Sequence, residues 1–205
     1  MDLYCDIIYI MSIQKNVEIG GQRQLPGWTN LGFRDNKFNL IFHEIPCNNG
    51  YLDNIYWSHV IEHIPPCFID NIIKKMYNKL RKGGCLRTVC PDLKEMVDAY
   101  VNKDINKFNT YKFGTSPQYY KDMGVGGHFV SKICTTHRYN PRADENLLFS
   151  GEKKQIGSLS HIGGYDEDML TILLKRAGFT KIERTGVISM DPHKGKGQLC
   201  INAYK

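Results

Sequence analysis

The chemically richest stretch of the sequence is SHVIEH, residues 58–63, which holds two imidazoles and a carboxylate. His59 and His63 are four residues apart, so on a helix they would share a face and could hold a metal ion. No third ligand stands nearby at a standard spacing, and the zinc-protease pattern HExxH is absent. We therefore interpret both histidines as polar groups at the edge of a ligand site and predict no metal. A buried, hydrogen-bonded histidine is the alternative for His63.

The segments around this stretch predict a strand, a helix and a second strand. Residues 55–60 favour a strand, a proline pair follows, and residues 69–80 repeat apolar side chains at helical spacing. Glycines 83 and 84 are expected to give the helix a left-handed exit into a strand at 85–90. Such a unit implies a parallel pair with a right-handed connection, hence an α/β sheet. Ligands bind beyond the carboxyl ends of such strands, where we expect Ser58, His59 and Asp92.

An earlier strand, at 17–19, runs into Gly20, Gly21 and Gln22. Glycines let the backbone approach a ligand closely, although a plain turn is the alternative. The distance from Gly20 to the next strand, at 29–31, is too short for a full helix with its connections. The first crossover helix is therefore expected to be reduced or missing.

Later segments complete the expected sheet. Residues 38–44 read as a third strand, and residues 93–101 read as a helix. A helix capped by Asp166 and ended at Gly178 should precede strands at 181–185 and 198–203.

Four sequence pieces occur in an order that resembles class I S-adenosylmethionine-dependent methyltransferases, and most of all their small, type 11-like members. The pieces are VEIGGQ, LPGW, the SHVIEHI to PDL unit, and HIGGYDEDMLTILLKRAGFTKIER, together covering about residues 16–101 and 160–204. The resemblance implies an α/β, Rossmann-like, mostly parallel sheet with helices on both faces and a C-terminal antiparallel hairpin. It also implies S-adenosylmethionine as cofactor.

Carried over residue by residue, the resemblance gives a set of cofactor contacts. Family members usually end the second strand with an acidic residue that holds the ribose hydroxyls, but Gly32 stands there, and Asp35 is the nearest carboxylate. Glu44 matches the position presented to the adenine, and a strand-end carboxylate facing water is its alternative. The expected contacts are Glu18, Gly20, Gly21, Gln22, Gly32, His43, Glu44, Ser58, His59 and His63.

The resemblance leaves residues 102–160 unassigned, and we expect them to form a variable lid that selects the substrate. Methyl transfer to a hydroxyl needs a base, for which His161 is preferred over Asp92 and His128. Relatives of this compact build imply a small-molecule or saccharide hydroxyl as acceptor. The alternative is a methyltransferase-like binding or assembly module without catalysis.

Length and composition exclude several other classes. The 205 residues fit one domain, 1–205, and the net charge of +6 comes from Lys and Arg spread along the chain, which does not favour a nucleic-acid partner. Seven cysteines without a CxxC pair predict reduced thiols in a cytoplasmic protein. The first residues lack the basic region of a signal peptide, and no apolar run is long enough to cross a bilayer.

Overall fold

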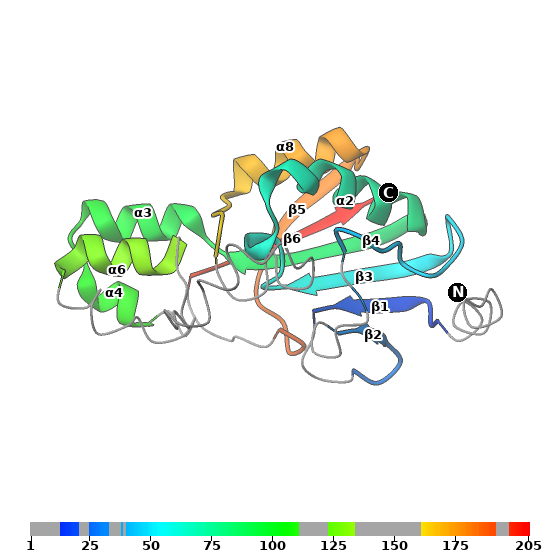
Figure 1. Cartoon of the computed structure of the whole chain (residues 1–205), viewed down its shortest axis with the longest axis horizontal. Coiled ribbons are helices and arrows are strands. Elements are labelled where there is room, and N and C mark those ends of the chain that lie inside the picture. The colour runs from blue at the N-terminus through cyan, green and yellow to red at the C-terminus, as the bar shows by residue number, and fades with distance from the viewer. Residues whose placement is uncertain are drawn as a thin grey trace, which may run out of the picture.

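The computed structural model describes residues 13–20, 25–32, 38, 40–110, 123–133, 161–191 and 197–205. Its centre is a six-stranded sheet in the order β2-β1-β3-β4-β6-β5 (Figure 1). Strands β2, β1, β3 and β4 are parallel, and β6 runs antiparallel to both β4 and β5. The predicted α/β, Rossmann-like sheet with an antiparallel C-terminal hairpin is confirmed. The strands are β1 Asn16–Ile19, β2 Thr29–Leu31, β3 Leu52–Ser58, β4 Leu80–Pro91, β5 Lys181–Thr185 and β6 Gln198–Tyr204.

Helix α2, Pro66–Lys79, connects β3 to β4 as predicted. Its first position is a proline, which loses no helical hydrogen bond there, and its apolar stripe Ile69, Ile72, Ile73 and Met76 is buried. The role expected for the glycine pair is wrong, because the chain is already extended at Leu80. Glycines 83 and 84 instead lie inside β4, where the register against β3 shifts, and Gly83 has a φ of 75°.

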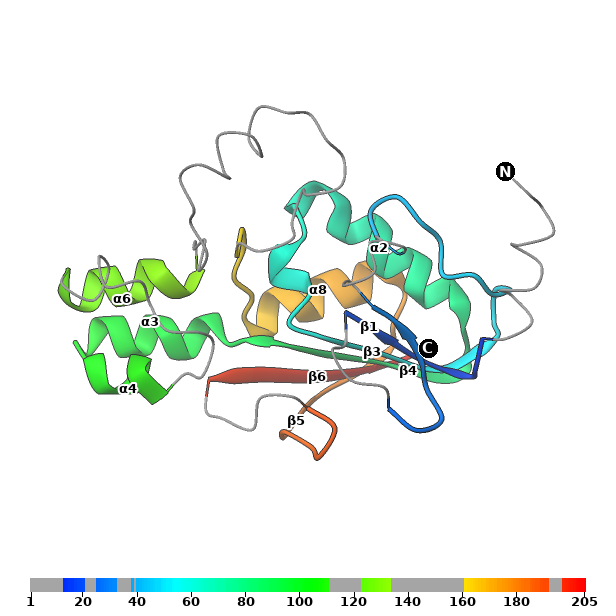
Figure 2. The same ribbon diagram turned by 60° about the horizontal axis from the view of Figure 1, so that its bottom comes forward.

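One face of the sheet is covered by α2 and by α8, Glu167–Ala177, which lie side by side (Figure 2). Within the described part of the chain, loop side chains cover the other face: Leu25, Trp28 and Met190 pack on Tyr56, Val89 and Cys200. We expected helices on both faces of the sheet. Among the described residues, helices α2 and α8 cover one face and loop side chains cover the other.

The link between β1 and β2 is short, as predicted. Its described part, residues 25–28, makes a turn and contains no helix. The amide of Trp28 donates to the carbonyl of Leu25, and Gly27 has a φ of 77°. After this turn the chain is back at the edge of the sheet where β1 begins. Strand β2 therefore pairs in parallel with β1.

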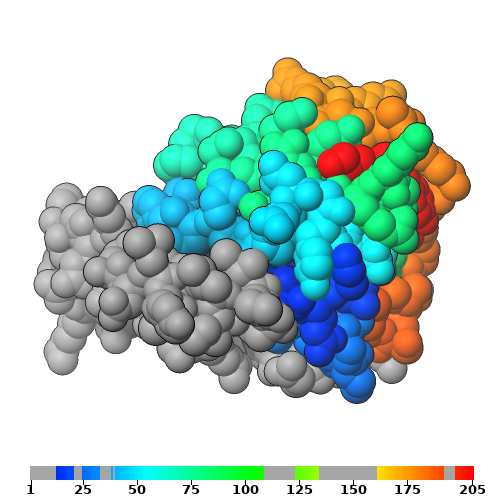
Figure 3. Space-filling view, turned by 90° about the vertical axis from the view of Figure 1, so that its right-hand side faces the viewer, coloured from blue at the N-terminus to red at the C-terminus, as the bar shows by residue number. Residues whose placement is uncertain are grey.

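The third strand expected at residues 38–44 is wrong for the positions that the structure describes. Residues 40–42 form a turn, and Leu40 and Ile45 enter the main core. The ammonium of Lys79, at the end of α2, donates to the carbonyl of Cys47. Figure 3, which faces the edge where the parallel strands begin, shows the light-blue segment that includes these residues beside α2. Apolar, strand-favouring residues therefore pack here without entering the sheet.

Three helices form a group beyond the carboxyl ends of the parallel strands (Figure 1). They are α3 Leu93–Val101, as predicted, α4 Ile105–Thr110 and α6 Gly124–Ile133. Met96, Ala99 and Phe108 form the group's own buried cluster. Part of the expected lid at 102–160 is thus helical. None of the helices that the structure describes is long and apolar enough to span a membrane.

Candidate functional site

A one-turn 3-10 helix, η1 Ile61–His63, follows β3 directly and places its polar residues at the carboxyl edge of the sheet. The turn from strand to helix occurs at His59, whose φ is 55°. This left-handed conformation is uncommon for a residue with a side chain, although histidine adopts it more often than most. The amide of His59 donates to the carbonyl of Val89 at 2.8 Å, which fixes the turn against β4.

Glu62 carries a fully buried carboxylate at this edge, with 1% of the residue exposed. Its Oε1 accepts a hydrogen bond of 3.1 Å from Nδ1 of His59. Its Oε2 is also buried, and it has no hydrogen-bond partner among the described residues. Burial raises the pKa of Glu62, but the hydrogen bond from His59 and the nearby charges of His59, His63 and His161 outweigh it, so the pKa lies below its ordinary value. The carboxylate is therefore ionised near neutral pH.

His161 reaches the same place from the other end of the chain. The amide of Ile162 donates to the carbonyl of Glu62 at 2.9 Å, and the amide of Leu93 donates to the carbonyl of Tyr165 at 2.9 Å. The segment from 161 to 165 is thus held along the ends of β3 and β4. Nδ1 of His161 lies 2.7 Å from the carbonyl oxygen of Lys132. Because a carbonyl only accepts, Nδ1 carries the proton, and in the neutral ring Nε2 keeps its lone pair.

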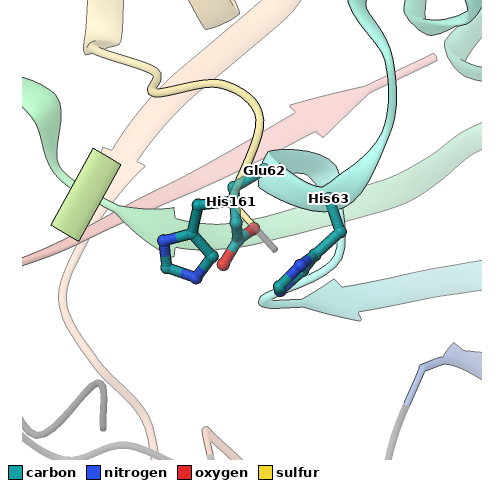
Figure 4. Close-up of side chains that lie close together, drawn as sticks. All are labelled: Glu62, His63 and His161. Carbon is teal, nitrogen blue, oxygen red and sulfur yellow. The ribbon is translucent and has the colours of Figure 1, made fainter. Parts of the chain in front are cut away.

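Glu62, His63 and His161 form one cluster, with a ligand-type atom from each lying within 4.8 Å of the others. The rings of His63 and His161 meet edge to face, with centroids 4.9 Å apart. Figure 4 shows the carboxylate of Glu62 between the two rings. The structure thus brings His63 together with Glu62 and with His161, which comes from a distant segment, whereas His59 is not part of this cluster. Sequence reasoning had not placed Glu62 in the site, although the spacing of His59 and Glu62 in one turn was a usable signal.

Gly20 lies at the end of β1, beside the residues that follow β3. The chain passes from β1 outward to β2 and then returns to β3 on the other side of β1, so the strand order reverses between β1 and β3. In open α/β sheets this switch point is where ligands bind. Gly20, Ser58 and His59, three of the expected cofactor contacts, flank it, while Gly21 and Gln22 lie outside the described residues.

Two other expected cofactor contacts lie near the same edge. Glu18 is buried on β1 and accepts a hydrogen bond of 3.1 Å from the side-chain amide of Asn30 on β2. Gly32 follows β2 and offers no side chain. Asp35, the nearest carboxylate in the sequence, lies outside the described residues.

Glu44 and His43 do not belong to this edge. The carboxylate of Glu44 lies 3.2 Å from the ammonium of Lys75 and 3.7 Å from that of Lys79. Both lysines are in the second half of α2, which ends where β4 begins, at the opposite edge of the sheet. The expected cofactor contacts of these two residues are therefore corrected, because the loop that carries them packs on α2 and does not form a strand.

Asp92 lies at the carboxyl end of β4, but its contacts are those of a structural residue. Its Oδ1 accepts from the amides of Lys94 and Glu95 and caps α3. Its Oδ2 accepts a hydrogen bond of 2.7 Å from the guanidinium of Arg184. With both oxygens engaged, Asp92 is poorly placed to take a proton from a substrate.

His128 is buried in the helical group, and its ring stacks on Phe108 with centroids 6.2 Å apart. It lies on α6, four residues before Lys132, whose carbonyl holds His161. The structure thus gives His128 a packing role and brings only His161, of the three expected bases, into the cluster.

A groove of about 270 Å³ lies between the start of α2 and α8. Most of its lining is apolar, and its described lining residues include neither the cluster nor Gly20. Gly163, Gly164 and Tyr165 line one part of this groove, and they belong to the segment that carries His161 along the strand ends.

Comparison with known proteins agrees with this architecture. No family model matches the chain, and no curated protein matches it. A solved S-adenosylmethionine-dependent methyltransferase from Archaeoglobus fulgidus superposes with a TM-score of 0.51 at 12% identity, over 99% of this chain and 91% of that one. One from Mesorhizobium loti gives a TM-score of 0.46 at 9% identity, over 94% and 91%. The apo methyltransferase SibL also gives 0.46, at 12% identity, and this chain spans 51% of its length. The chain has the fold of the class I S-adenosylmethionine-dependent methyltransferases.

Proposed function

We propose that this protein is a methyltransferase that binds S-adenosylmethionine at the carboxyl ends of β1 to β4 and methylates a hydroxyl of a small molecule or saccharide. One observation carries the proposal: a buried carboxylate and two imidazoles gather next to the switch point of this fold. Polar groups buried at a ligand-binding edge are a mark of functional sites.

The residues at the switch point fit the cofactor at its methionine end. Gly20 takes a left-handed backbone conformation with a φ of 75°, which lets the chain turn sharply after β1. Ser58 and His59 supply polar groups on the facing strand end. At the ribose end the fit is poorer, because Gly32 cannot supply a carboxylate. We therefore expect binding, but weaker binding than a ribose carboxylate would allow.

When bound, S-adenosylmethionine supplies an electrophilic methyl group. An acceptor hydroxyl would have to give up its proton as it took this methyl group. We assign the acceptance of that proton to the cluster, with Nε2 of His161 as the basic atom. The hydrogen bond from Nδ1 of His161 to Lys132 fixes the tautomer that this role requires.

The missing ribose carboxylate at Gly32 favours a second candidate, a methyltransferase-like binding module without catalysis. The two candidates differ in one measurement. Purified protein is incubated with S-adenosylmethionine labelled in its methyl group and with panels of small-molecule and saccharide alcohols. We expect label in one acceptor class, and His161→Gln should slow transfer roughly 10²- to 10⁴-fold, the usual contribution of a general base.

A matched control replaces a partly exposed carboxylate outside the cluster. Glu183→Gln on β5 removes only a surface ion pair with Lys181 and should leave transfer unchanged. Cofactor binding without label transfer to any acceptor would favour the non-catalytic module.

A further inference from the structure

We propose that Glu62, His63 and His161 bind a divalent transition-metal ion of the Zn²⁺ class. One carboxylate oxygen and two imidazole nitrogens are a donor set that zinc enzymes use, with the remaining coordination position left to water or substrate. The three side chains converge within 4.8 Å, from two segments far apart in the sequence.

Hydrogen bonds hold two of the three side chains, Glu62 and His161, in fixed orientations. The hydrogen bond from His59 holds Oε1 of Glu62, and Oε2 is buried without a hydrogen-bond partner among the described residues. The carbonyl of Lys132 binds Nδ1 of His161 and so fixes Nε2 as the basic atom. Ligands to protein-bound metals are regularly held in this way, by a carbonyl on the far nitrogen of a histidine and a hydrogen bond on a carboxylate.

The buried oxygen also needs a partner that the described residues do not provide. A buried carboxylate atom without a hydrogen bond costs free energy, roughly 1–3 kcal/mol or more. A cation coordinated by Oε2 would remove this cost. Around a tetrahedral zinc the ligand atoms stand about 3.4 Å apart, so atoms that now lie within 4.8 Å of one another would need to draw together by at most about 1.4 Å.

Access to the ion would be from the side of His63, which is half-buried while Glu62 and His161 are buried. If the proposed methyl transfer is correct, the ion would bind the acceptor hydroxyl and lower its pKa, and His161 would act as a ligand in place of a free base. This role rests on the proposed function, but the binding of the ion does not.

The test uses the full-length protein, stripped of metal with a chelator and titrated with ZnCl₂, CoCl₂ and MgCl₂ without S-adenosylmethionine. We expect one Zn²⁺ per chain, Co²⁺ binding with visible absorption bands, and no Mg²⁺ binding at comparable concentrations. Glu62→Gln and His161→Gln should each weaken Zn²⁺ binding about 100-fold, and His59→Gln about 10-fold through its effect on Glu62.

Matched controls remove one imidazole and one carboxylate that do not belong to the cluster. His43→Gln changes an exposed residue and Glu183→Gln a partly exposed one, both outside the cluster, and both variants should bind Zn²⁺ like the wild type. Thermal unfolding checks that each variant folds. If a variant of the two buried residues does not fold, His63→Gln tests the same site at a half-buried position.

Two results would overturn the proposal. One is a wild-type protein that binds no stoichiometric Zn²⁺. The other is stoichiometric binding that survives both Glu62→Gln and His161→Gln, which would place the ion elsewhere in the chain. Failure of metal binding with intact S-adenosylmethionine binding would leave the proposed function standing, with His161 as the base.

Discussion

Val60 lies against Gly20 so closely that a β-carbon on Gly20 would come nearer to Cγ2 of Val60 than real β-carbons come to another atom. The contact joins the end of β1 to the residues after β3, across the switch point of the sheet. It gives Gly20 a packing reason in addition to its left-handed φ of 75°. The glycine alone is therefore not evidence for a ligand, and the case for a site depends on the polar cluster beside it.

This contact predicts that Gly20→Ala will destabilise the fold. A left-handed conformation costs a residue with a β-carbon about 1–2 kcal/mol, and the overlap with Val60 adds about 1–3 kcal/mol. In the double variant Gly20→Ala/Val60→Ala, the overlap is removed, so the protein should regain the part of the stability that the overlap cost. Urea unfolding of both variants and of Val60→Ala measures this coupling, and purely additive effects would contradict it.

The absent side chain at the end of β2 predicts a gain of affinity. Gly32→Asp should introduce a carboxylate that can accept hydrogen bonds from the ribose hydroxyls of S-adenosylmethionine. A hydrogen bond to a charged group contributes about 1.5–3 kcal/mol, so the dissociation constant should fall at least about tenfold. The amide variant Gly32→Asn is the control and should gain less. Equal affinities for the wild type and Gly32→Asp would contradict the assigned ribose position.

A buried ion pair holds the face of the sheet opposite α2 and α8. The guanidinium of Arg87 lies 2.7 Å from the carboxylate of Asp191, which also accepts a hydrogen bond of 2.9 Å from the hydroxyl of Tyr56. Asp191 is fully buried, and Arg87 donates further to Thr185 and Asn202. The network ties the loop after β5 to the centre of the sheet.

Breaking this pair on one side should be costly because it leaves a buried charge without its partner. We expect Asp191→Ala to lower the free energy of unfolding by about 3–5 kcal/mol. The double variant Arg87→Met/Asp191→Ala should lose less than the sum of the two single variants. Urea unfolding of the four proteins in the cycle tests this, and a coupling energy near zero would refute the account of the pair.

Stability should also fall at alkaline pH through a buried thiol. Burial raises the pKa of Cys200 to about 11, from 9.0 for an unperturbed thiol. The folded state therefore keeps the proton where the unfolded state loses it. This contribution is fully present below pH 9 and is lost as the pH rises toward 11.

The measurement is the free energy of unfolding of the wild type and of Cys200→Ala between pH 8 and about pH 10.5. The advantage of the wild type should shrink as the pH rises, by at most about 1.4 kcal/mol per pH unit for one proton. A difference that does not change with pH would show that Cys200 does not titrate in this way.

Local patterns predicted most of the sheet and its helices. The helix at residues 93–101 and the strand at 181–185 are found as predicted, and Asp166 caps α8, which ends at Gly178 in a left-handed conformation. These elements carry their own caps and an apolar face. Residues 38–44 were misread because their residue types favour a strand, whereas their place is set by packing on α2.

In helix α6 the error is the reverse: no helix was predicted there, but the structure has one. Its glycines disfavour a helix, but Val125, Phe129 and Ile133 recur every four residues and pack on the cluster around Met96 and Phe108. That spacing was a signal in the sequence. The meeting of Glu62 with His161 was not predictable in this way, since it depends on the path of the chain along the ends of β3 and β4.

The central claim is that the switch point binds S-adenosylmethionine, and calorimetric titration of the purified protein tests it most directly. S-adenosylmethionine and S-adenosylhomocysteine are titrated separately, with NADH as a comparison ligand that suits other sheets of this class. We predict saturable binding of the first two at one site per chain, and little binding of NADH. No heat of binding for either sulfur compound at millimolar concentration would contradict the account.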